Sequence, residues 1–481
     1  MSRTAIILII AAVYVVVLAA ISIGVRKYAR TSSNFTTGAR VFPAAFIGFL
    51  MASEFIGTSA TLGTAQRAYE DGISAAWNIV ALSVGFVLFG FLLSRRYKAI
   101  GENTISAVMK RGYGEGVRRA TSAVMVIALL IIGVAMYVGG AAIFSSILGV
   151  NKVVATVLTG VIAVVYVGFG GMRSVVYTNV LHALILVVGI VIAAVVPLNI
   201  VGGFGELQAQ LPASFFSWHA VGFGQIVAWV IAGAGAIFVT QYIVQAIYTV
   251  SDARTAKRAG FYSAIYLIPY ALLAAVAGMC AAVLFPNIES VNALPVLVTD
   301  MNVVLAGLVI CGLLAGLLGT VSATTLAIST LLLKDFYRPF FNAAGDERKD
   351  LWFVRGATVA AGLVPIVLAL YGSNLLAITF LAKGLRASLA VLVVLMFFAP
   401  RFGTRRGALV SIIAAIICTL GWFLAGNPFG VDDAYIAVGV PLLVMAVSQL
   451  WRLARRSGGE PVLAEPEHGH EPAPEVGGAD R

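Results

Sequence analysis

The residues best suited to do chemistry are charged side chains inside long apolar runs. Glu54 lies within the segment 49–69, at a depth that corresponds to the middle of a bilayer. A charged side chain there costs about 2.5–3.5 kcal/mol on insertion scales, so it marks a functional site by default. Gly57, Thr58 and Ser59 follow it, and such a cluster suits a helix that breaks and offers free carbonyl groups to an ion or solute. The alternative is a continuous helix whose small residues permit close packing.

Two cations, Lys383 and Arg386, lie in a second apolar run, three residues apart and therefore on one helix face. In one interpretation Lys383 extends to the outer interface and Arg386 pairs with Glu54 as a gate. In the other, the arginine captures an anionic group, for which its planar fork is well suited. The two roles can coexist. We expect Glu54 to pair with Arg386 when the site is empty, Lys383 to stay closer to water, and an incoming carboxylate to take over part of the Arg386 fork.

The composition predicts a helical membrane protein that crosses the bilayer many times. Of 481 residues, 60% are hydrophobic and 11% are charged, and the mean hydropathy is +0.98, values that no soluble domain shares. Cys280, Cys311 and Cys418 are odd in number and far apart, which favours neither a disulfide framework nor a metal site. The sequence contains no H-E-x-x-H, G-x-S-x-G or P-loop motif, so we expect no enzyme.

A membrane helix needs about 20 apolar residues, and segments of that kind can be counted by length and flanks. Thirteen are predicted, so the two termini should lie on opposite sides. The segments are 5–25, 43–66, 73–94, 119–148, 152–170, 177–201, 223–248, 260–286, 303–333, 353–371, 373–399, 407–426 and 434–452.

The positions of lysine and arginine predict the orientation. Nearly all of them fall in loops on one side, within 26–40, 95–119, 254–258, 334–355, 401–406 and 452–456. Because cationic loops stay in the cytoplasm, we expect a cell-membrane protein with its N-terminus outside and its C-terminus inside. The net charge of +11 therefore reflects topology and not nucleic-acid binding.

A second segment resembles the first interrupted one in character. Within 224–248 the stretch Ala232 to Ala236 is small and favours helix poorly, and Thr240, Gln241 and Gln245 follow it. Paired interrupted helices in matching positions of two halves indicate a transporter with inverted five-helix repeats. Gly235 and Gln241 are accordingly candidates for the solute site, together with Glu54, Gly57, Thr58, Lys383 and Arg386.

The predicted organisation has five parts. A peripheral first helix and loop cover 1–42, the two repeats cover 43–201 and 202–399, and two additional helices cover 400–456. The aromatic-rich loop 202–222 within the second repeat should cap the outer surface. The remainder, 457–481, is rich in Pro, Gly and Glu and should be a disordered cytoplasmic tail.

Four spaced motifs resemble those of the sodium:solute symporter family. Leu62-Gly63 with Ala68-Tyr69 and Gly72 is similar to the end of that family's first core helix, and Gly170-Gly171 with Val175 and Thr178 is similar to the start of its fifth. Gln241-Tyr242-Ile243-Val244-Gln245 resembles the end of its sixth, and Lys334-Asp335-Phe336-Tyr337 resembles the end of its eighth. The resemblance covers nearly all of 1–456 and implies a ten-helix inverted-repeat core from about 43 to 399.

The resemblance also implies a sodium site between the broken first core helix and the eighth. The carbonyl positions fall on Ser53 and Ile56, and the eighth-helix positions fall on Gly316, Gly319 and Thr320. A hard cation prefers such oxygen ligands. Gly319 departs from the family pattern, which has serine there, so one hydroxyl ligand is missing; nearby hydroxyls or water could fill the gap.

Two residues of the fifth core helix bear on the coupling ion. Asn179 stands where some relatives have an aspartate that holds a second sodium, so we expect one coupled cation. His182 stands where glutamine is usual. It could carry a proton, or it could be a hydrogen-bonded residue near the cytoplasmic surface.

The sequence therefore predicts cation-coupled uptake, most simply with sodium as the coupling ion, of a small organic solute by alternating access. A carboxylate-bearing metabolite, such as a short-chain organic acid or an amino acid, is the preferred class. The alternatives are a proton-coupled transporter of the same fold and a membrane sensor, although the roughly 30 residues after Trp451 offer no signalling domain. The expected partners are the solute and membrane lipid, with no nucleic acid, and the expected functional unit is a monomer.

Overall fold

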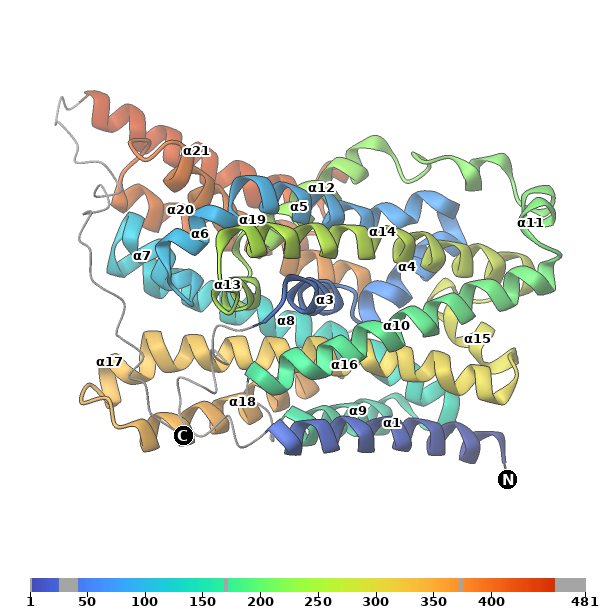
Figure 1. Cartoon of the computed structure of the whole chain (residues 1–481). Coiled ribbons are helices and arrows are strands. Elements are labelled where there is room, and N and C mark those ends of the chain that lie inside the picture. The colour runs from blue at the N-terminus through green and yellow to red at the C-terminus, as the bar shows by residue number, and fades with distance from the viewer. Residues whose placement is uncertain (1, 26–41, 168–171, 372–374, 455–481) are drawn as a thin grey trace.

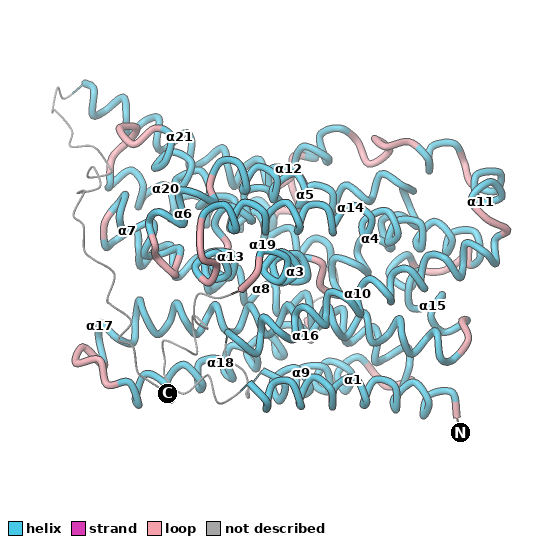
Figure 2. The backbone as a smooth tube through the Cα atoms, viewed as in Figure 1, coloured by secondary structure: helices cyan, strands magenta, loops and turns pink. Residues whose placement is uncertain are grey.

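The computed structural model describes residues 2–25, 42–167, 172–371 and 375–454, and every regular element in these ranges is a helix (Figures 1 and 2). Helices suit a lipid environment because each satisfies its backbone hydrogen bonds internally. The predicted tail 457–481, most of the loop 26–42 and the motif at Gly170-Gly171 lie outside the described residues.

The main helices follow the predicted order, and the list gives their bounds. They are α1 (Arg3–Val25), α5 (Trp77–Leu92), α6 (Ser94–Ile100), α7 (Ile105–Tyr113), α8 (Glu115–Leu148), α9 (Lys152–Val167), α10 (Met172–Val201), α14 (Ala253–Leu284), α15 (Ala293–Asp300), α16 (Val303–Leu332), α17 (Arg338–Phe341), α18 (Glu347–Ala369), α19 (Leu375–Phe398), α20 (Arg405–Leu424) and α21 (Asp433–Ala454).

Ten helices of the described residues are long and apolar enough to cross a membrane, or up to eleven if one bent pair counts as a span. Each of the thirteen predicted segments coincides with helix, but the count is lower for two structural reasons. The helices Ala44–Phe55 (α3) and α9 are each shorter than 18 residues, and the second and third predicted segments meet in one apolar stretch, Thr58–Leu92. An all-helical membrane fold is confirmed.

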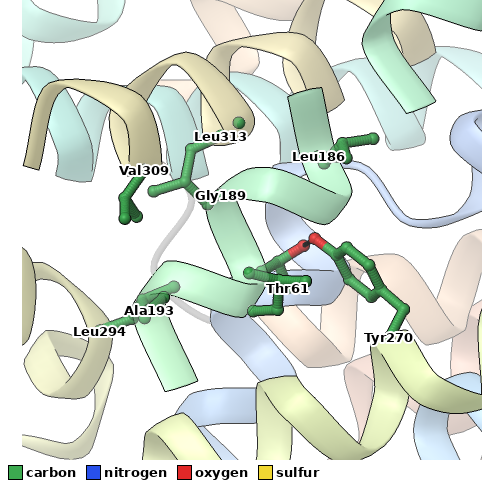
Figure 3. A pocket seen from close by; sticks show the side chains of 10 residues that line it. Thr61, Leu186, Gly189, Ala193, Tyr270, Leu294, Val309 and Leu313 are labelled. Atoms are coloured by element: carbon green, nitrogen blue, oxygen red, sulfur yellow. Dashed lines mark hydrogen bonds between the residues drawn. The ribbon is translucent and has the colours of Figure 1, made fainter. Parts of the chain in front are cut away.

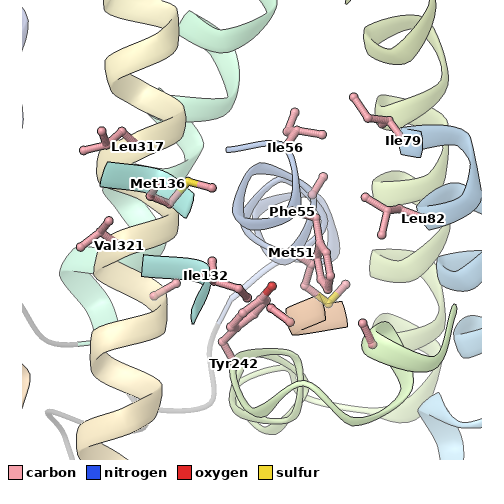
Figure 4. Packing of buried hydrophobic residues seen from close by; sticks show 14 of the residues in the cluster. Met51, Phe55, Ile56, Ile79, Leu82, Ile132, Met136, Tyr242, Leu317 and Val321 are labelled. Atoms are coloured by element: carbon pink, nitrogen blue, oxygen red, sulfur yellow. The ribbon is translucent and has the colours of Figure 1, made fainter. Parts of the chain in front are cut away.

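The first predicted break is present. α3 ends at Phe55, and α4 (Thr58–Asp71) begins after Ile56 and Gly57, whose φ/ψ angles are −99°/41° and −59°/174°. Figure 4 shows the end of α3 in the middle of the bundle, where Met51, Phe55 and Ile56 lie between α16 and α5. The break therefore lies in the protein core, where surrounding helices can compensate for the lost backbone hydrogen bonds.

The second break is also present, but its predicted place within Ala232 to Ala236 was wrong. α12 (Phe223–Val239) runs unbroken through those residues, and the chain bends by 47° at Thr240 before α13 (Gln241–Tyr248). The glycines serve close packing instead. A Cβ on Gly235 would lie 2.5 Å from Ala387 Cβ on α19, and one on Gly233 would lie 3.4 Å from the backbone of Ala81 on α5.

The loop 202–222 lies over the end of α4, at the end of the bundle where α1 begins (Figure 1). It contains α11 (Phe204–Gln210) and the short helix η3 (Ala213–Phe216). Trp77 Nε1 donates to Trp218 O at 2.9 Å. Gly72 adopts a φ of +69°, and a Cβ there would lie 2.1 Å from Phe215 O, so only glycine fits beneath this cap.

Candidate functional site

The break between α3 and α4 faces α16 directly. The last carbonyl groups of α3 lose their intrahelical partners there, and Thr320 Oγ1 on α16 donates to one of them, Glu54 O, at 3.1 Å. A Cβ on Gly316 would lie 3.0 Å from the amide nitrogen of Thr58, so the two backbones touch. The structure thus brings Gly316 and Thr320 against the break itself, at Glu54, Gly57 and Thr58, the neighbours of Ser53 and Ile56 in the chain.

Gly319 faces α10 and not open space. A Cβ at this position would lie 2.7 Å from Asn179 Oδ1 and 3.3 Å from the His182 ring. Ser53 Oγ donates to the same Asn179 oxygen at 2.9 Å, and Asn179 Nδ2 donates to Val175 O at 2.8 Å. The amide oxygen of Asn179 therefore occupies the space that a larger side chain at 319 would need.

His182 is fully buried among the helices. Its Nδ1 is 2.5 Å from Tyr14 OH on α1, and its Nε2 is 3.1 Å from Tyr166 OH on α9. These contacts agree with the interpretation of His182 as a hydrogen-bonded helix residue.

Lys383 is 2% exposed, so its ammonium group does not extend to the outer interface, as one interpretation expected. Its Nζ donates to Asn78 Oδ1 at 3.2 Å and lies 4.3 Å from the centre of the Phe380 ring. Asn78 Nδ2 in turn donates to Thr64 Oγ1 at 2.9 Å. The ammonium group therefore contacts an amide and an aromatic face between α19, α5 and α4.

Arg386 is 1% exposed and lies beside the second break. Its Nη1 donates to Thr240 Oγ1 and its Nε donates to Ala382 O, both at 2.9 Å. Its guanidinium carbon lies 5.6 Å from the centre of the Phe55 ring. Among the described residues, its polar and aromatic contacts are these three groups and Tyr242 OH. All four of them are neutral.

The predicted pair between Glu54 and Arg386 is absent. Among the described residues no ion pair includes Glu54, and its Oε2 is buried without a hydrogen-bond partner. The reason is local. The Phe55 ring lies against the guanidinium group, and two of its five N–H donors bind Thr240 and Ala382 instead of a carboxylate.

The other solute candidates divide into two groups. Gly57 and Thr58 lie at the first break, where Thr58 Oγ1 donates to Leu313 O at 2.6 Å. Gly235 is packed against α19 with no space for a solute. Gln241 is also occupied, because its Oε1 accepts from Ile105 N at 2.8 Å and its Nε2 donates to Asn103 O at 3.0 Å.

A vestibule that is partly open to solvent is lined by Phe380, which lies one turn before Lys383 on α19. Its floor includes Trp229 and Phe380, whose rings stack with centroids 5.6 Å apart, and Lys383 lies against the Phe380 ring. Gln66, Asp432 and Asp433 line its walls. An aromatic floor thus separates a wet vestibule from a buried ammonium group.

A much smaller cavity is lined by residues of α4, α10, α14, α15 and α16 (Figure 3). Thr61 and Tyr270 point toward one another there, with their hydroxyl oxygens 2.7 Å apart. The other residues labelled in Figure 3 are Gly189 and residues with apolar side chains. This lining suits a charged solute less well than the surroundings of Lys383.

Sequence reasoning missed several residues at these sites: Tyr14, Asn78, Tyr166 and Tyr242. Asn78 could have been found, because an amide within the apolar segment 73–94 is unusual. The tyrosines gave no such signal, since an aromatic residue in a membrane helix is ordinary.

The sequence pattern of the sodium:solute symporter family matches residues 35–415. The fold is similar to that of a Na+-coupled sialic acid symporter in a substrate-bound outward-open state, with a TM-score of 0.78 at 16% identity over 95% of this chain and 98% of that one. It also resembles Mhp1, a nucleobase-cation-symport-1 family transporter with bromovinylhydantoin bound, with a TM-score of 0.60 at 16% identity over 90% and 96%. A manganese transporter of Eremococcus coleocola matches with a TM-score of 0.50 at 12% identity over 88% and 99%.

Proposed function

Because this chain belongs to the sodium:solute symporter family, whose activity is sodium-coupled solute symport, we propose that it couples sodium entry to the uptake of a small carboxylate-bearing solute. The family membership establishes that the chain is a transporter and not an enzyme. The site, the solute class and the direction of transport are our proposals, and each has its own support.

The sodium site is proposed at the first break. Ser53 and Ile56 would supply carbonyl oxygens, and Thr320 would supply a hydroxyl across the gap to α16. Two observations support this: Thr320 Oγ1 is 3.1 Å from a carbonyl oxygen of the break, and α16 touches the break at Gly316. Carbonyl and hydroxyl oxygens fit a hard monovalent cation. Gly319 has no side chain and therefore contributes no side-chain oxygen. Sodium bound there would neutralise the partial negative charge of the α3 carbonyl end.

The solute class rests on one observation, namely two buried cations without a counter-charge. Lys383 and Arg386 are each at most 2% exposed, and among the described residues neither contacts a carboxylate. Burying unpaired charge is costly, so a state in which an anion joins them is favoured. A carboxylate fits the planar fork of Arg386, and it would enter from the vestibule once the stacked rings of Trp229 and Phe380 move apart.

A thermal-shift screen of the purified protein tests both parts. Organic acids, amino acids and sugars would each be added with and without sodium. We expect a small carboxylate to raise the unfolding temperature only when sodium is present, since a ligand that binds the native state stabilises it in proportion to its occupancy. Stabilisation by neutral sugars alone would contradict the solute class.

Proton coupling is a second candidate, and Glu54 favours it. This carboxyl group is 3% exposed, and its Oε2 has no hydrogen-bond partner among the described residues. A buried group in that position is stable when protonated. Uptake into vesicles without sodium, driven only by a proton gradient, would favour this candidate over sodium.

We also propose that the chain lies in the cell membrane with its N-terminus outside and works as a monomer by alternating access. The distribution of lysine and arginine supports the orientation. Closure of the bundle at the end opposite the vestibule supports alternating access, because one side is open while the other is sealed.

A further inference from the structure

A chain of buried hydroxyl groups and one imidazole joins four helices next to the proposed sodium site. Tyr14 comes from α1, Tyr166 from α9, His182 from α10 and Ser322 from α16. All four residues are buried or largely so. Neither the sodium nor the solute proposal uses this cluster, so its role needs a separate explanation.

The hydrogen bonds of this cluster run in one direction. Tyr166 OH donates to Thr178 Oγ1 at 2.8 Å, and Thr178 Oγ1 donates to Ser174 O at 2.8 Å. The Tyr166 oxygen is thus free to accept from His182 Nε2–H at 3.1 Å. A neutral imidazole has only one N–H, so Nδ1 must accept, and its partner is Tyr14 OH. Tyr14 therefore fixes both the tautomer and the ring orientation of His182.

The oriented ring lies directly against the proposed sodium site. Its Cδ2 would be 3.3 Å from a Cβ on Gly319, the residue before Thr320. Ser322 lies beside Tyr166, and its Oγ donates to Gly319 O at 2.9 Å. The cluster thus holds α10 and α9 against the turn of α16 that carries Thr320.

α1 is packed to support this arrangement. One face of the helix carries Ile7, Tyr14 and Leu18, which are at most 7% exposed, while Val13 and Val16 on another face are at least 59% exposed. A Cβ on Gly307 would lie 2.6 Å from the Ile10 side chain, so α1 contacts α16 closely. Figure 1 shows α1 along one edge of the bundle.

We propose that Tyr14 is a positioning residue of the cation site, so that α1, a helix outside the ten-helix core, sets the sodium affinity through His182. This inference rests on the proposed sodium site at Thr320. Groups that orient the surroundings of a cation affect its binding although they do not touch it. A fully satisfied buried network also holds one geometry, whereas a partly satisfied one does not.

The test compares Tyr14→Phe, Tyr166→Phe and the double variant with the wild type. Sodium affinity is measured on the purified full chain as the sodium concentration that gives half of the maximal thermal shift. Losing one hydrogen bond should raise that concentration about fivefold in each single variant. The double variant should show much less than the product of the two effects, because both hydroxyl groups act through one ring.

Tyr113→Phe is the matched control. Tyr113 is buried too, and its hydroxyl donates to Leu392 O at 2.9 Å between α7 and α19, outside the cluster. This variant should lose stability without a change in sodium affinity. If Tyr14→Phe behaves in the same way, the inference is wrong while the sodium proposal stands. If the wild type shows no sodium-dependent shift, both are wrong.

Discussion

At the scale of single residues, Thr320 carries the sodium proposal, because its Oγ1 lies 3.1 Å from Glu54 O across the break. Thr320→Ala removes this oxygen and should raise the sodium concentration for half-maximal uptake about fivefold or more, whereas Thr320→Ser should be tolerated. Thr324→Ala is the control, since Thr324 Oγ1 donates to Thr320 O within α16 and faces no break. Equal effects of the two alanine variants would remove Thr320 from the site.

Arg386 carries the solute proposal in the same way. Arg386→Ala should weaken carboxylate binding about 10- to 100-fold, because hydrogen bonds to a charged group contribute about 1.5–3 kcal/mol. Arg386→Lys should recover little, since a point charge cannot replace a planar fork. Sodium-dependent stabilisation should remain in both variants, which shows that they fold.

Arg67→Ala is a suitable control for Arg386, because Arg67 lines the vestibule but its side chain is 39% exposed and pairs with Asp71 on its own helix. This variant should bind the solute nearly as the wild type does. Unchanged solute affinity in Arg386→Ala would exclude Arg386 from the site, as measured by isothermal titration.

The sequence indicated which charges matter but not what they contact. Glu54, Lys383 and Arg386 stand out because charge inside an apolar run is costly wherever it points. Their neighbours, however, depend on how helices far apart in the chain meet. Arg386 contacts Thr240, 146 residues away, and Lys383 contacts Asn78, 305 residues away. Pairing by opposite sign, the basis for the Glu54–Arg386 prediction, ignored the Phe55 ring that lies against Arg386.

At the scale of elements, the cap over α4 depends on the backbone of Gly72. Gly72→Ala should destabilise the protein by about 1–3 kcal/mol from backbone strain alone, and further because the new Cβ would lie 2.1 Å from Phe215 O. Gly101→Ala has the same φ of +69° with nothing within 4 Å, but its ψ is 15° and not −146°, so it should lose less stability both from strain and from contact. Thermal unfolding of both variants measures the difference. Equal losses of stability would mean that the cap moves away without cost.

The position of the helix breaks illustrates what element-level reasoning can achieve. The first was predicted correctly because Gly57 and the hydroxyl residues around it coincide with the break itself. The second was placed too early, within the small residues of α12, because glycine weakens a helix in water. In the bundle those glycines allow α12 to approach α5 and α19, and their packing outweighs the poor propensity. The bend falls at Thr240, where Arg386 donates to the hydroxyl group.

At the scale of the molecule, the end of the bundle opposite the vestibule is sealed by polar contacts between helices. Arg118 Nε on α8 donates to Asp335 Oδ1 at 2.7 Å, and Arg118 Nη2 donates to Lys334 O at 2.9 Å. Asp335 lies in the π-helical turn η5 (Leu333–Tyr337) that follows α16. Lys334 Nζ reaches Asn103 Oδ1, and Gln241 binds the backbone beside it. α8, α13 and α16 therefore meet at one closed end.

This closure leads to a prediction about the whole transport cycle. Asp335 is fully buried and Arg118 is 17% exposed, and removing one partner of such a pair costs about 3–5 kcal/mol. Asp335→Asn keeps the side-chain size but removes the buried charge, so that Glu115, which is 40% exposed, is the one carboxylate left to Arg118 among the described residues. The population should therefore shift toward a state that is open at this end. A cysteine introduced at Val244 reports the shift, because Val244 lines a cavity of about 300 Å³ beside Tyr97 and Gly101. Cys280, Cys311 and Cys418 would first be replaced by alanine.

We expect a polar maleimide to label this cysteine at least about tenfold faster in Asp335→Asn than in the parent, since about 1.4 kcal/mol of population shift already gives that factor. Glu102→Gln is the control, because the pair between Glu102 and Arg111 is more exposed, at 29% and 57%, and such pairs contribute only about 0–1 kcal/mol. It should leave the labelling rate unchanged. Sodium should slow labelling in Asp335→Asn if it binds at the first break, because it stabilises the arrangement in which α3 and α16 touch. Equal labelling of Asp335→Asn and the parent would show that the Arg118–Asp335 pair does not hold this end closed.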